Sequence, residues 1–366
     1  MRVLVTGADG FIAKNLIIRL QEIGVEIFKF TRKNHFSDLQ VIVPQVDFIF
    51  HLSGVNRPKN TIEFKKDNFN FTAELSKLVE KNQQNISIVY TSSVQAEQNN
   101  PYGVSKLQSE EELIRLVNLN KANVAIYRLP NVFGKWSKPN YNSVVATFCY
   151  NTIYDLPLNI HDASSLVNLV YIDDLVDSFL KILEFGIRKL ERPIIQNQHF
   201  ITVGELAKII QSFKAEREGY IGPVGTGLTR ALYSTYLSFY EPQKFKYGLV
   251  PKLDLRGKFV EVLKTKDFGQ ISFFTINSGM TRGGHYHHTK NEKFIVVQGS
   301  ARFKFRHIIS NETYEIITNG NKPEVVETIP GWSHDITNIG TNEMIVIIWA
   351  NEVFDKKLPD TVPYKV

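Results

Sequence analysis

Tyr102 and Lys106, a tyrosine and a lysine four residues apart, form the first candidate pair for acid/base chemistry. Side chains at this spacing lie on one face of a helix, so the two are expected to be neighbours. A lysine beside a phenol lowers the pKa of the phenol, which lets it exchange a proton with a substrate oxygen near neutral pH. Ser93, at the end of the preceding apolar segment, can hold the same oxygen by a hydrogen bond. With a hydride carrier, these side chains predict the interconversion of a carbonyl and an alcohol.

Three histidines and a glutamate form a second candidate site nearer the C-terminus. His285 and His287 are two residues apart, and on a strand such residues point to the same face. Glu292 begins the next apolar segment and can converge on that face, and His334 offers a fourth ligand. Imidazoles and a carboxylate bind Zn²⁺ or another divalent first-row metal. The ion could be catalytic or could only stabilise the fold, and the sequence leaves both readings open.

The turn after the first apolar segment predicts a dinucleotide site. Gly7 and Gly10 allow a tight turn and a close approach of the backbone to a pyrophosphate. The next helix, opening with Phe11 and Ile12, offers its free N–H groups to that anion. An NAD site would show an acid after the second strand, where this sequence has Arg32 and no nearby carboxylate. Arg32 suits a 2′-phosphate, so we expect NADPH, with a solvated basic turn as the alternative.

The elements that must position these residues fall into two kinds. Over the first 180 residues, short apolar segments alternate with helical stripes, which is typical of an α/β Rossmann-like doubly wound parallel sheet. After residue 244, strands follow one another with Gly and Asn turns between them, which predicts an all-β domain. We therefore expect an NADP-binding domain over 1–243 and a second domain over 244–366. The expected strands are 3–5, 25–30, 48–52, 86–90 and 124–127, then 259–263, 271–276, 294–297, 301–306, 314–317 and 344–349.

Composition narrows the class of protein. The chain has 366 residues, 43% hydrophobic and 22% charged, which suits two folded domains and excludes disorder as the main state. The lone cysteine, Cys149, excludes a disulfide scaffold, no apolar run is long enough for a membrane span, and no signal-peptide layout opens the chain. We therefore expect a cytoplasmic protein. The net charge of +6 is thinly spread, with 17 basic against 13 acidic residues after residue 243, so a small anionic ligand fits better than nucleic acid.

The first 240 residues resemble the extended short-chain dehydrogenase/reductase family. The resemblance is carried by the glycine turn and the Tyr–Lys pair, together with segments 51–54 and 128–134. It implies that Tyr102 is the acid/base, that Lys106 activates it and contacts the nicotinamide ribose, and that Ser93 holds the substrate oxygen.

The same resemblance narrows the chemistry. It implies cofactor contacts from Leu52 and Asn68 and a substrate contact from Asn131. The sugar dehydratases of this family carry an acid pair directly after the serine or threonine, where this sequence has Val94 and Gln95. Those side chains cannot supply an acid and a base, which argues against dehydration. Reduction of a ketone, or 4-epimerisation through one, remains, and the expected NADPH favours reduction.

The C-terminal segment resembles the cupin family, which has a jelly-roll barrel, and within it the sugar-nucleotide 3-epimerases. The His and Glu spacing matches the first cupin motif, and segments 254–259 and 278–286 look like conserved stretches of those epimerases. That resemblance implies that Arg282 holds the substrate diphosphate and that His285 is the base. Because His285 also fits as a metal ligand, the base is left open. Other proton carriers nearby are His288, Tyr286 and Lys293.

Nearly the whole chain resembles the bifunctional epimerase/reductases of bacterial capsular polysaccharide biosynthesis, the CapF-like family. Segments such as 51–58, 135–142 and 287–293 carry the match. It implies a cytosolic homodimer or higher oligomer with a zinc-bearing cupin domain. It also implies a UDP-2-acetamido-2,6-dideoxy-4-keto-hexose as substrate and UDP-2-acetamido-2,6-dideoxy-L-talose, on the route to N-acetyl-L-fucosamine, as product. Lys135, with Lys138 and Asn142, would line the sugar-nucleotide cleft.

One ketone joins the two expected sites. A ketone at sugar C4 makes the C3 proton acidic, because its removal gives an enolate that a cation stabilises. The cupin domain is therefore expected to invert C3 first, and the N-terminal domain to reduce C4 with NADPH second. Two alternatives stay open. The protein could be a reductase only, with the cupin domain as a sugar-binding or dimerisation module, or a non-enzymatic redox-sensing NADP binder.

Overall fold

The computed structural model describes residues 1–58, 60–82, 85–218, 220–249, 252–254, 257–259, 264–265, 269–352 and 357–366. By its contacts the chain divides into two compact units. Unit 1 holds Met1–Ser143 and Leu166–Ile201, and unit 2 holds Val144–Ser165 and Thr202–Val366. The expected domain boundary at residue 243 stays a prediction. None of the described helices is long and apolar enough to cross a membrane.

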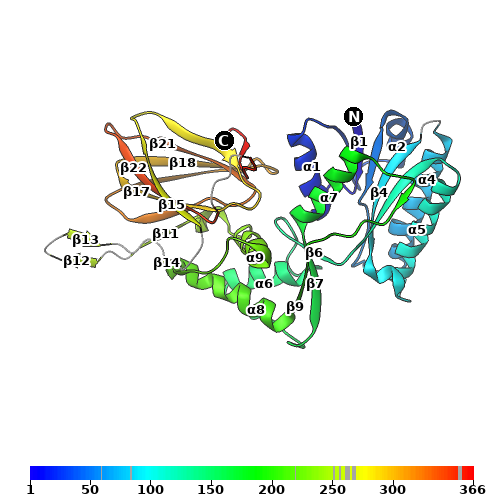
Figure 1. Cartoon of the computed structure of the whole chain (residues 1–366), viewed down its shortest axis with the longest axis horizontal. Helices are drawn as coiled ribbons and strands as arrows, with labels where there is room; N and C mark the ends of the chain where they lie inside the picture. Colours follow the sequence, from blue (N-terminus) through cyan, green and yellow to red (C-terminus); the bar gives the residue numbers. More distant parts are fainter. Residues whose placement is uncertain are drawn as a thin grey trace. The chain divides into compact units, whose positions relative to one another are not determined.

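A parallel sheet forms the centre of unit 1, with the strand order β2-β1-β3-β4-β5-β8 (Figure 1). Its strands are β1 (Arg2–Thr6), β2 (Glu26–Phe30), β3 (Phe48–His51), β4 (Ile86–Ser93), β5 (Ala122–Leu129) and β8 (Leu190–Glu191). The strand order reverses between β1 and β3, which is where doubly wound sheets bind ligands. The predicted N-terminal strands are all present, and the Rossmann-like fold class is confirmed.

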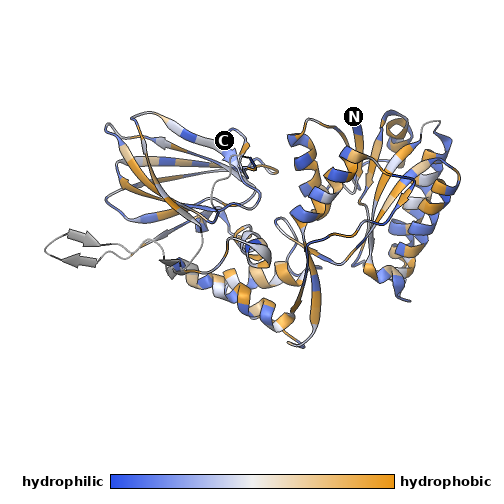
Figure 2. Ribbon diagram, in the orientation of Figure 1, coloured by the Kyte–Doolittle hydropathy of each residue, from blue (hydrophilic) through white to orange (hydrophobic). Residues whose placement is uncertain are grey.

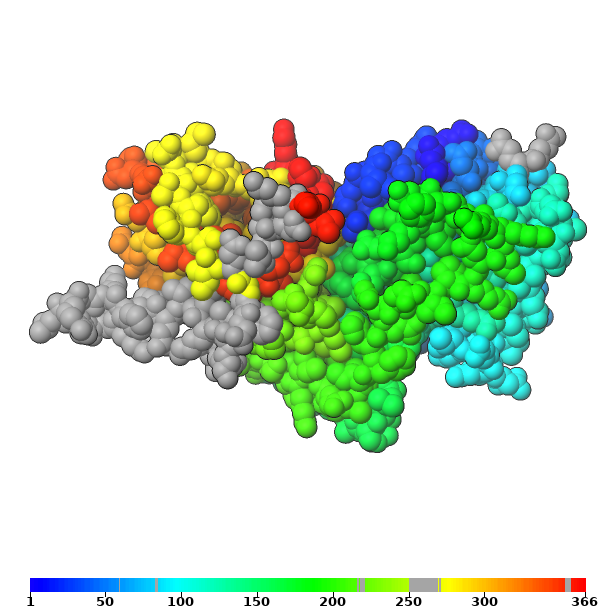
Figure 3. All heavy atoms as spheres, viewed as in Figure 1, coloured from blue at the N-terminus to red at the C-terminus, as the bar shows by residue number. Residues whose placement is uncertain are grey.

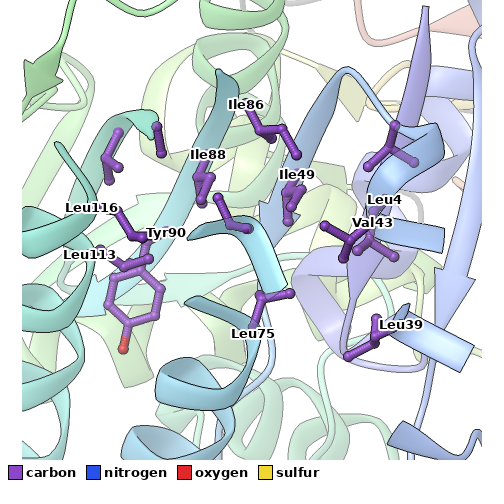
Figure 4. Packing of buried hydrophobic residues seen from close by; sticks show 14 of the residues in the cluster. Leu4, Leu39, Val43, Ile49, Leu75, Ile86, Ile88, Tyr90, Leu113 and Leu116 are labelled. Atoms are coloured by element: carbon purple, nitrogen blue, oxygen red, sulfur yellow. The ribbon is translucent and has the colours of Figure 1, made fainter. Parts of the chain in front are cut away.

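Helices cover both faces of this sheet (Figure 1). On one face α1 (Phe11–Glu22) packs on α7 (Ile172–Phe185), and on the other α4 (Phe71–Lys81) packs on α2 (Phe36–Ile42) and α5 (Pro101–Asn118). Apolar side chains of β1, β3 and β4, such as Leu4, Ile49 and Ile88, meet those of the second helix layer in a buried cluster (Figure 4). The helices carry hydrophobic residues on one side and hydrophilic residues on the other, so burial of one face orients each helix (Figure 2).

A smaller sheet and several helices complete the α/β part of the chain. The sheet has the order β6-β7-β9, made of β6 (Asn131–Phe133), β7 (Leu166–Tyr171) and β9 (Gln198–Thr202). In unit 2, α8 (Val203–Ser212) packs on α6 (Val144–Ile153) and α9 (Gly227–Leu237). Thr202 caps α8, because its hydroxyl accepts from the Glu205 N–H at 3.2 Å while the Glu205 carboxylate accepts from the Thr202 N–H at 3.1 Å.

Two five-stranded antiparallel sheets form the main β part of unit 2, as the predicted all-β fold requires. The first is β11 (Lys246–Gly248), β20 (Glu324–Glu327), β17 (Glu292–Gln298), β22 (Met344–Ala350) and β15 (Gln270–Ile276). The second is β19 (Thr313–Asn319), β18 (Ser300–His307), β21 (Trp332–Asn338), β16 (Thr281–Tyr286) and β23 (Val362–Pro363). Phe294 of the first sheet packs on Phe303 of the second, so the aromatic core lies between the sheets. The strand expected over 259–263 lies, beyond Phe259, outside the described residues.

Candidate functional site

A large cleft of about 1450 Å³ lies in unit 1, over the carboxyl ends of β1 to β5. Of the residues singled out in the sequence, the structure gathers along this cleft Gly7, Gly10, Phe11, Ile12, Arg32, Leu52, Ser93, Tyr102, Lys106 and Asn131. These residues come from five separate strand ends, and the parallel sheet brings them together because such ends share one edge. The cleft is large enough for a dinucleotide and a second ligand beside it.

The glycine turn sits at the switch point of the sheet. A Cβ on Gly7 would lie 2.8 Å from the Ser53 Cα, and Gly7 has φ of +66°, so only glycine lets the loops after β1 and β3 meet. Gly10 precedes α1 without a side-chain cap, so the first N–H groups of α1 stay available to an anion.

Tyr102 and Ser93 are brought together by the start of α5. Asn100 caps this helix by accepting from the Gly103 N–H at 2.8 Å. A Cβ on Gly103 would collide with the Gln95 carbonyl, so this glycine lets the helix pack directly on the turn after Ser93. Burial raises the pKa of Tyr102, and its hydrogen bond with Ser93 opposes that rise. Tyr102 is therefore a protonated phenol poised to donate.

Lys106 is buried beneath the same turn. Its ammonium donates to the Thr91 carbonyl at 2.8 Å and lies 4.9 Å from the centre of the Tyr90 ring. Burial lowers the pKa of Lys106 to about 8, against the opposing charge of Glu110. The sequence predicted that Lys106 lowers the pKa of Tyr102. In the structure the ammonium donates to the Thr91 carbonyl and burial raises the pKa of Tyr102, so the role of Lys106 toward the phenol stays a prediction.

Asn68 does not line the cleft, although a cofactor contact was expected from it. Its side-chain carbonyl accepts from the Val55 N–H at 2.8 Å, and its amide donates to the Val55 carbonyl at 3.1 Å and to Ser105 Oγ at 3.0 Å. Asn68 therefore fixes the loop after β3 beneath the cleft. His51 does similar work, since its ring bridges Thr6 and Thr72, and burial lowers the pKa of His51 to about 3.

Arg32 lies at the rim of the cleft, with its side chain 82% exposed. The sequence showed no carboxylate near it, but the fold brings Asp67 Oδ2 to 3.8 Å from its guanidinium. The side chain can still reach a phosphate, because an exposed ion pair at this distance is weak.

Lys135 was expected to line the sugar-nucleotide cleft, but the structure buries it. Its ammonium pairs with Asp173 at 2.8 Å, and it is not part of the cleft lining. Trp136, which follows with φ of +69°, and Lys138 do line the cleft. The buried pair thus anchors the loop that presents these two neighbours.

The four predicted metal ligands converge in unit 2. One donor atom each from His285, His287, Glu292 and His334 lies within 4.8 Å of the others. Glu292 Oε2 is 3.1 Å from His287 Nε2 and 3.4 Å from His334 Nε2. His285 of β16, Glu292 of β17 and His334 of β21 lie on neighbouring strands, and His287 follows directly after β16, which pairs with β21 at His285 and His334.

The electrostatics of this cluster suit a cation. Burial, then the charge of His334, lowers the pKa of His285 to about 4, and burial also lowers the pKa of His334. Burial alone would raise the pKa of Glu292, but hydrogen bonds with His287 and His334 hold it well below its usual range. Neutral imidazoles and a charged carboxylate are the forms that bind a metal. The donor set therefore fits a first-row divalent ion.

Two of the candidate bases are not among the four convergent donors. Lys293 follows Glu292 on β17, so its side chain points to the opposite face, where its ammonium pairs with the buried Glu327. His288 packs edge-on against Tyr286, with ring centres 5.4 Å apart, and is not one of the four convergent donors. The side chain of Lys293 is thus engaged on the face opposite Glu292, and the roles of Lys293 and His288 as proton carriers stay predictions.

Lys290 lies beside the cluster, whereas Arg282 contacts an aromatic ring elsewhere on the sheets. Lys290, which sequence reasoning missed, has its ammonium 3.8 Å from Glu292 Oε1. It stands in the turn between β16 and β17, where strand periodicity gives no direction for a side chain. Arg282 lies 5.7 Å from the Phe274 ring, and a bulge between Gly283 and His285 shifts the register of β16 between it and the cluster.

Comparisons with known proteins agree with this geometry. Residues 3–192 match the NAD dependent epimerase/dehydratase family, and residues 252–362 match the polysaccharide biosynthesis C-terminal domain. The chain is 52% identical over 363 residues to the UDP-2-acetamido-2,6-beta-L-arabino-hexul-4-ose reductase of Pseudomonas aeruginosa, covering 99% of this chain and 98% of that one.

Solved structures agree as well. The capsular polysaccharide assembling protein CapF from Staphylococcus aureus superposes with a TM-score of 0.68, 38% identity and full coverage of both chains. UDP-glucuronic acid 4-epimerase from Bacillus cereus matches 59% of this chain and 84% of its own, with a TM-score of 0.52 and 19% identity, which supports the fold alone.

Proposed function

Since the chain belongs to the NAD dependent epimerase/dehydratase family, we propose that it is an NADPH-dependent reductase of a UDP-linked 4-keto sugar that also inverts C3. One observation supports the assignment of reductase activity. Tyr102, Ser93 and Lys106 meet in a single cleft that also contains the glycine turn. The name of the 52% identical relative supports a UDP-2-acetamido-2,6-dideoxy-4-keto-hexose as substrate.

In the reduction, NADPH supplies the hydride. The α1 N-terminus behind Gly10 holds the pyrophosphate, and Arg32 holds the 2′-phosphate. Ser93 Oγ holds the ketone oxygen, and the Tyr102 phenol donates its proton to that oxygen as it becomes an alcohol. Lys106, charged below about pH 8, stabilises the phenolate that results.

Beyond the catalytic residues, the cleft suits a nucleotide diphosphate sugar. Asn131, Trp136 and Lys138 line it, so an amide, an aromatic ring and a cation are available to the sugar, base and phosphates. The product would be UDP-2-acetamido-2,6-dideoxy-L-talose, for capsule or O-antigen assembly. We further propose a cytoplasmic homodimer, on the strength of the CapF resemblance.

The C3 inversion is assigned to the cluster of unit 2. His285, His287, Glu292 and His334 would hold the divalent ion, whose chemistry there is polarisation of a carbonyl oxygen. With the imidazoles engaged as ligands, Lys290 is a proton-carrying side chain beside them. Inversion must precede reduction, because C3–H is acidic only while C4 is a ketone.

The test is to incubate the protein with the keto sugar in D₂O, first without and then with NADPH. The proposal predicts deuterium at C3 without NADPH and a deuterated talose product after NADPH is added. NADPH consumption without exchange at C3 would leave a reductase whose all-β unit only binds sugar or mediates assembly. Exchange without any NADPH consumption would remove the reductase assignment.

A further inference from the structure

The last residues of the chain run along the metal cluster as a strap, residues 360–364. β23 extends the second sheet of unit 2 by pairing with β16, at Pro363 with His285 and at Val362 with Tyr286. The Tyr364 N–H donates to the Gly284 carbonyl at 2.8 Å. These residues are half-buried or exposed, so the strap lies at the surface of the unit, where red C-terminal atoms are visible in Figure 3.

The carboxylate of Asp360 joins the strap to the turn that follows His287. Its two oxygens accept from the backbone N–H groups of His288 at 2.8 Å, Thr289 at 2.7 Å and Lys290 at 2.7 Å. Three N–H donors on one carboxylate make a charge-assisted set that fixes the path of the turn. The charge of His288 and these N–H donors outweigh burial and hold the pKa of Asp360 well below its usual range.

The backbone carbonyl of Asp360 contacts His287 itself. His287 Nδ1 lies 2.5 Å from this oxygen, and because a carbonyl only accepts, Nδ1 must carry the proton. With Nδ1 protonated, Nε2 is the ring nitrogen that binds a metal ion, once it has released any proton it shares with Glu292 Oε2, 3.1 Å away. A partner of this kind fixes the tautomer and the ring orientation of a metal-bound histidine.

We propose that Asp360 is the positioning residue of the metal site: its carboxylate anchors the 288–290 turn, and its carbonyl fixes the tautomer of His287. Asp360 is not itself a ligand. The inference rests on the metal site of the proposed function and extends it to a residue 73 positions beyond His287.

The experiment measures Zn²⁺ affinity of the full chain by competition with a chromophoric chelator. Asp360→Ala keeps the backbone carbonyl but removes the carboxylate that anchors the 288–290 turn, so the carbonyl is no longer held on His287 and Zn²⁺ should bind about 10- to 100-fold more weakly than in the wild type. Asp360→Asn keeps one acceptor oxygen and should fall between the two. Leu358→Ala, in the same segment and 82% exposed, is the matched control and should bind like the wild type.

A second measurement separates positioning from general stabilisation. In the Zn²⁺-loaded wild type, ¹⁵N NMR of the histidines should show His287 with a protonated Nδ1 and a metal-bound Nε2. This signature needs no variant, so it decides the tautomer even if Asp360→Ala fails to fold. Circular dichroism of each variant shows whether weaker binding accompanies an intact fold.

The outcomes distinguish failure of the proposed metal site from failure of the proposed role of Asp360. A wild type that binds no Zn²⁺ would remove the proposed metal site and this inference with it. A wild type that binds Zn²⁺ with the same affinity as folded Asp360→Ala would overturn the role of Asp360 and leave the metal site standing. A His287 bound through Nδ1 would overturn it as well.

Discussion

The cleft of unit 1 and the histidine cluster of unit 2 differ in size and in the kind of ligand that fits them. The cleft is a volume of about 1450 Å³ lined by side chains from many strand ends, whereas the four donors of the cluster fit within 4.8 Å of one another. An open cleft suits ligands that enter and leave at each turnover. A closed set of donors suits an ion that stays. Because the two sites differ in this way and lie in different units, we expect that each can be inactivated without the other.

Burial acts on both sites, but with different results for charge. In the cleft it lowers the pKa of Lys106 to about 8 and raises the pKa of Tyr102, so both groups move toward their neutral forms. In the cluster, burial lowers the pKa of His285 and of His334, yet hydrogen bonds with His287 and His334 hold the pKa of Glu292 well below its usual range. These shifts are consistent with the proton transfer proposed for the cleft and with the cation site proposed for the cluster.

The variant with the largest expected effect inactivates the cleft of unit 1 and leaves the cluster of unit 2 intact. Tyr102→Phe removes the proton donor, so kcat/KM for ketone reduction should fall by about 10²- to 10⁴-fold. NADPH affinity, measured by fluorescence titration, should change little, and C3 exchange in D₂O should continue. Tyr314→Phe, on β19 of unit 2, serves as the control. Normal NADPH consumption by Tyr102→Phe would contradict the assignment.

The converse variant breaks the cluster and spares the cleft. Glu292→Gln keeps the shape but removes the charge on which the ion depends, so Zn²⁺ affinity should fall by about 100-fold or more, and C3 exchange with it. Reduction of a ketone already inverted at C3 should proceed at the wild-type rate. Glu315→Gln, half-exposed on β19, should change neither measurement. A parallel loss of reductase activity in Glu292→Gln would show that the sites are not independent.

The pH dependence of the reductase activity tests the effect of burial on Lys106 in the cleft. Because burial lowers the pKa of Lys106 to about 8, reductase kcat/KM should fall about tenfold per pH unit above that value as the ammonium is lost. The same depressed pKa makes a charged Lys106 unfavourable in the folded state, so its contribution to stability improves between about pH 8 and 10.5, the unfolded value. Activity should therefore fall over a range in which melting curves show no loss of fold.

The variant Lys106→Arg tests whether Lys106 causes the fall in kcat/KM at alkaline pH. Arginine stays protonated throughout the range, so the alkaline fall should disappear even if the rate at neutral pH is lower. C3 exchange, measured over the same pH range, controls for effects on substrate. An unchanged alkaline limb in Lys106→Arg would assign the titration to another group.

The sequence predicted the parts of both sites that depend on local spacing. Tyr102 and Lys106 share a face of α5, as helical periodicity predicts, and the strand spacing of His285 and His287 predicted their convergence, although β16 ends just before His287. The same strand rule places Lys293 on the face opposite Glu292, because it directly follows Glu292.

Other features depend on chain segments that are distant in sequence. Lys135 is buried because Asp173, 38 residues away, pairs with it. Asp360 contacts a turn that lies about 70 residues earlier. No local pattern marks such partners, so motif reading locates the groups that react but not those that hold them.

The smallest effect is expected at the exposed rim of the cleft, where burial no longer amplifies charge. Arg32→Ala should raise the KM for NADPH about tenfold and leave the KM for NADH nearly unchanged, because only NADPH carries the 2′-phosphate. Asp67→Asn should act in the opposite direction, since it removes the carboxylate 3.8 Å from the guanidinium, and should lower the KM for NADPH about twofold. Both effects should shrink at high salt, which screens exposed charges but leaves the buried cluster of unit 2 unaffected. Equal losses with NADPH and NADH in Arg32→Ala would remove Arg32 as the phosphate ligand.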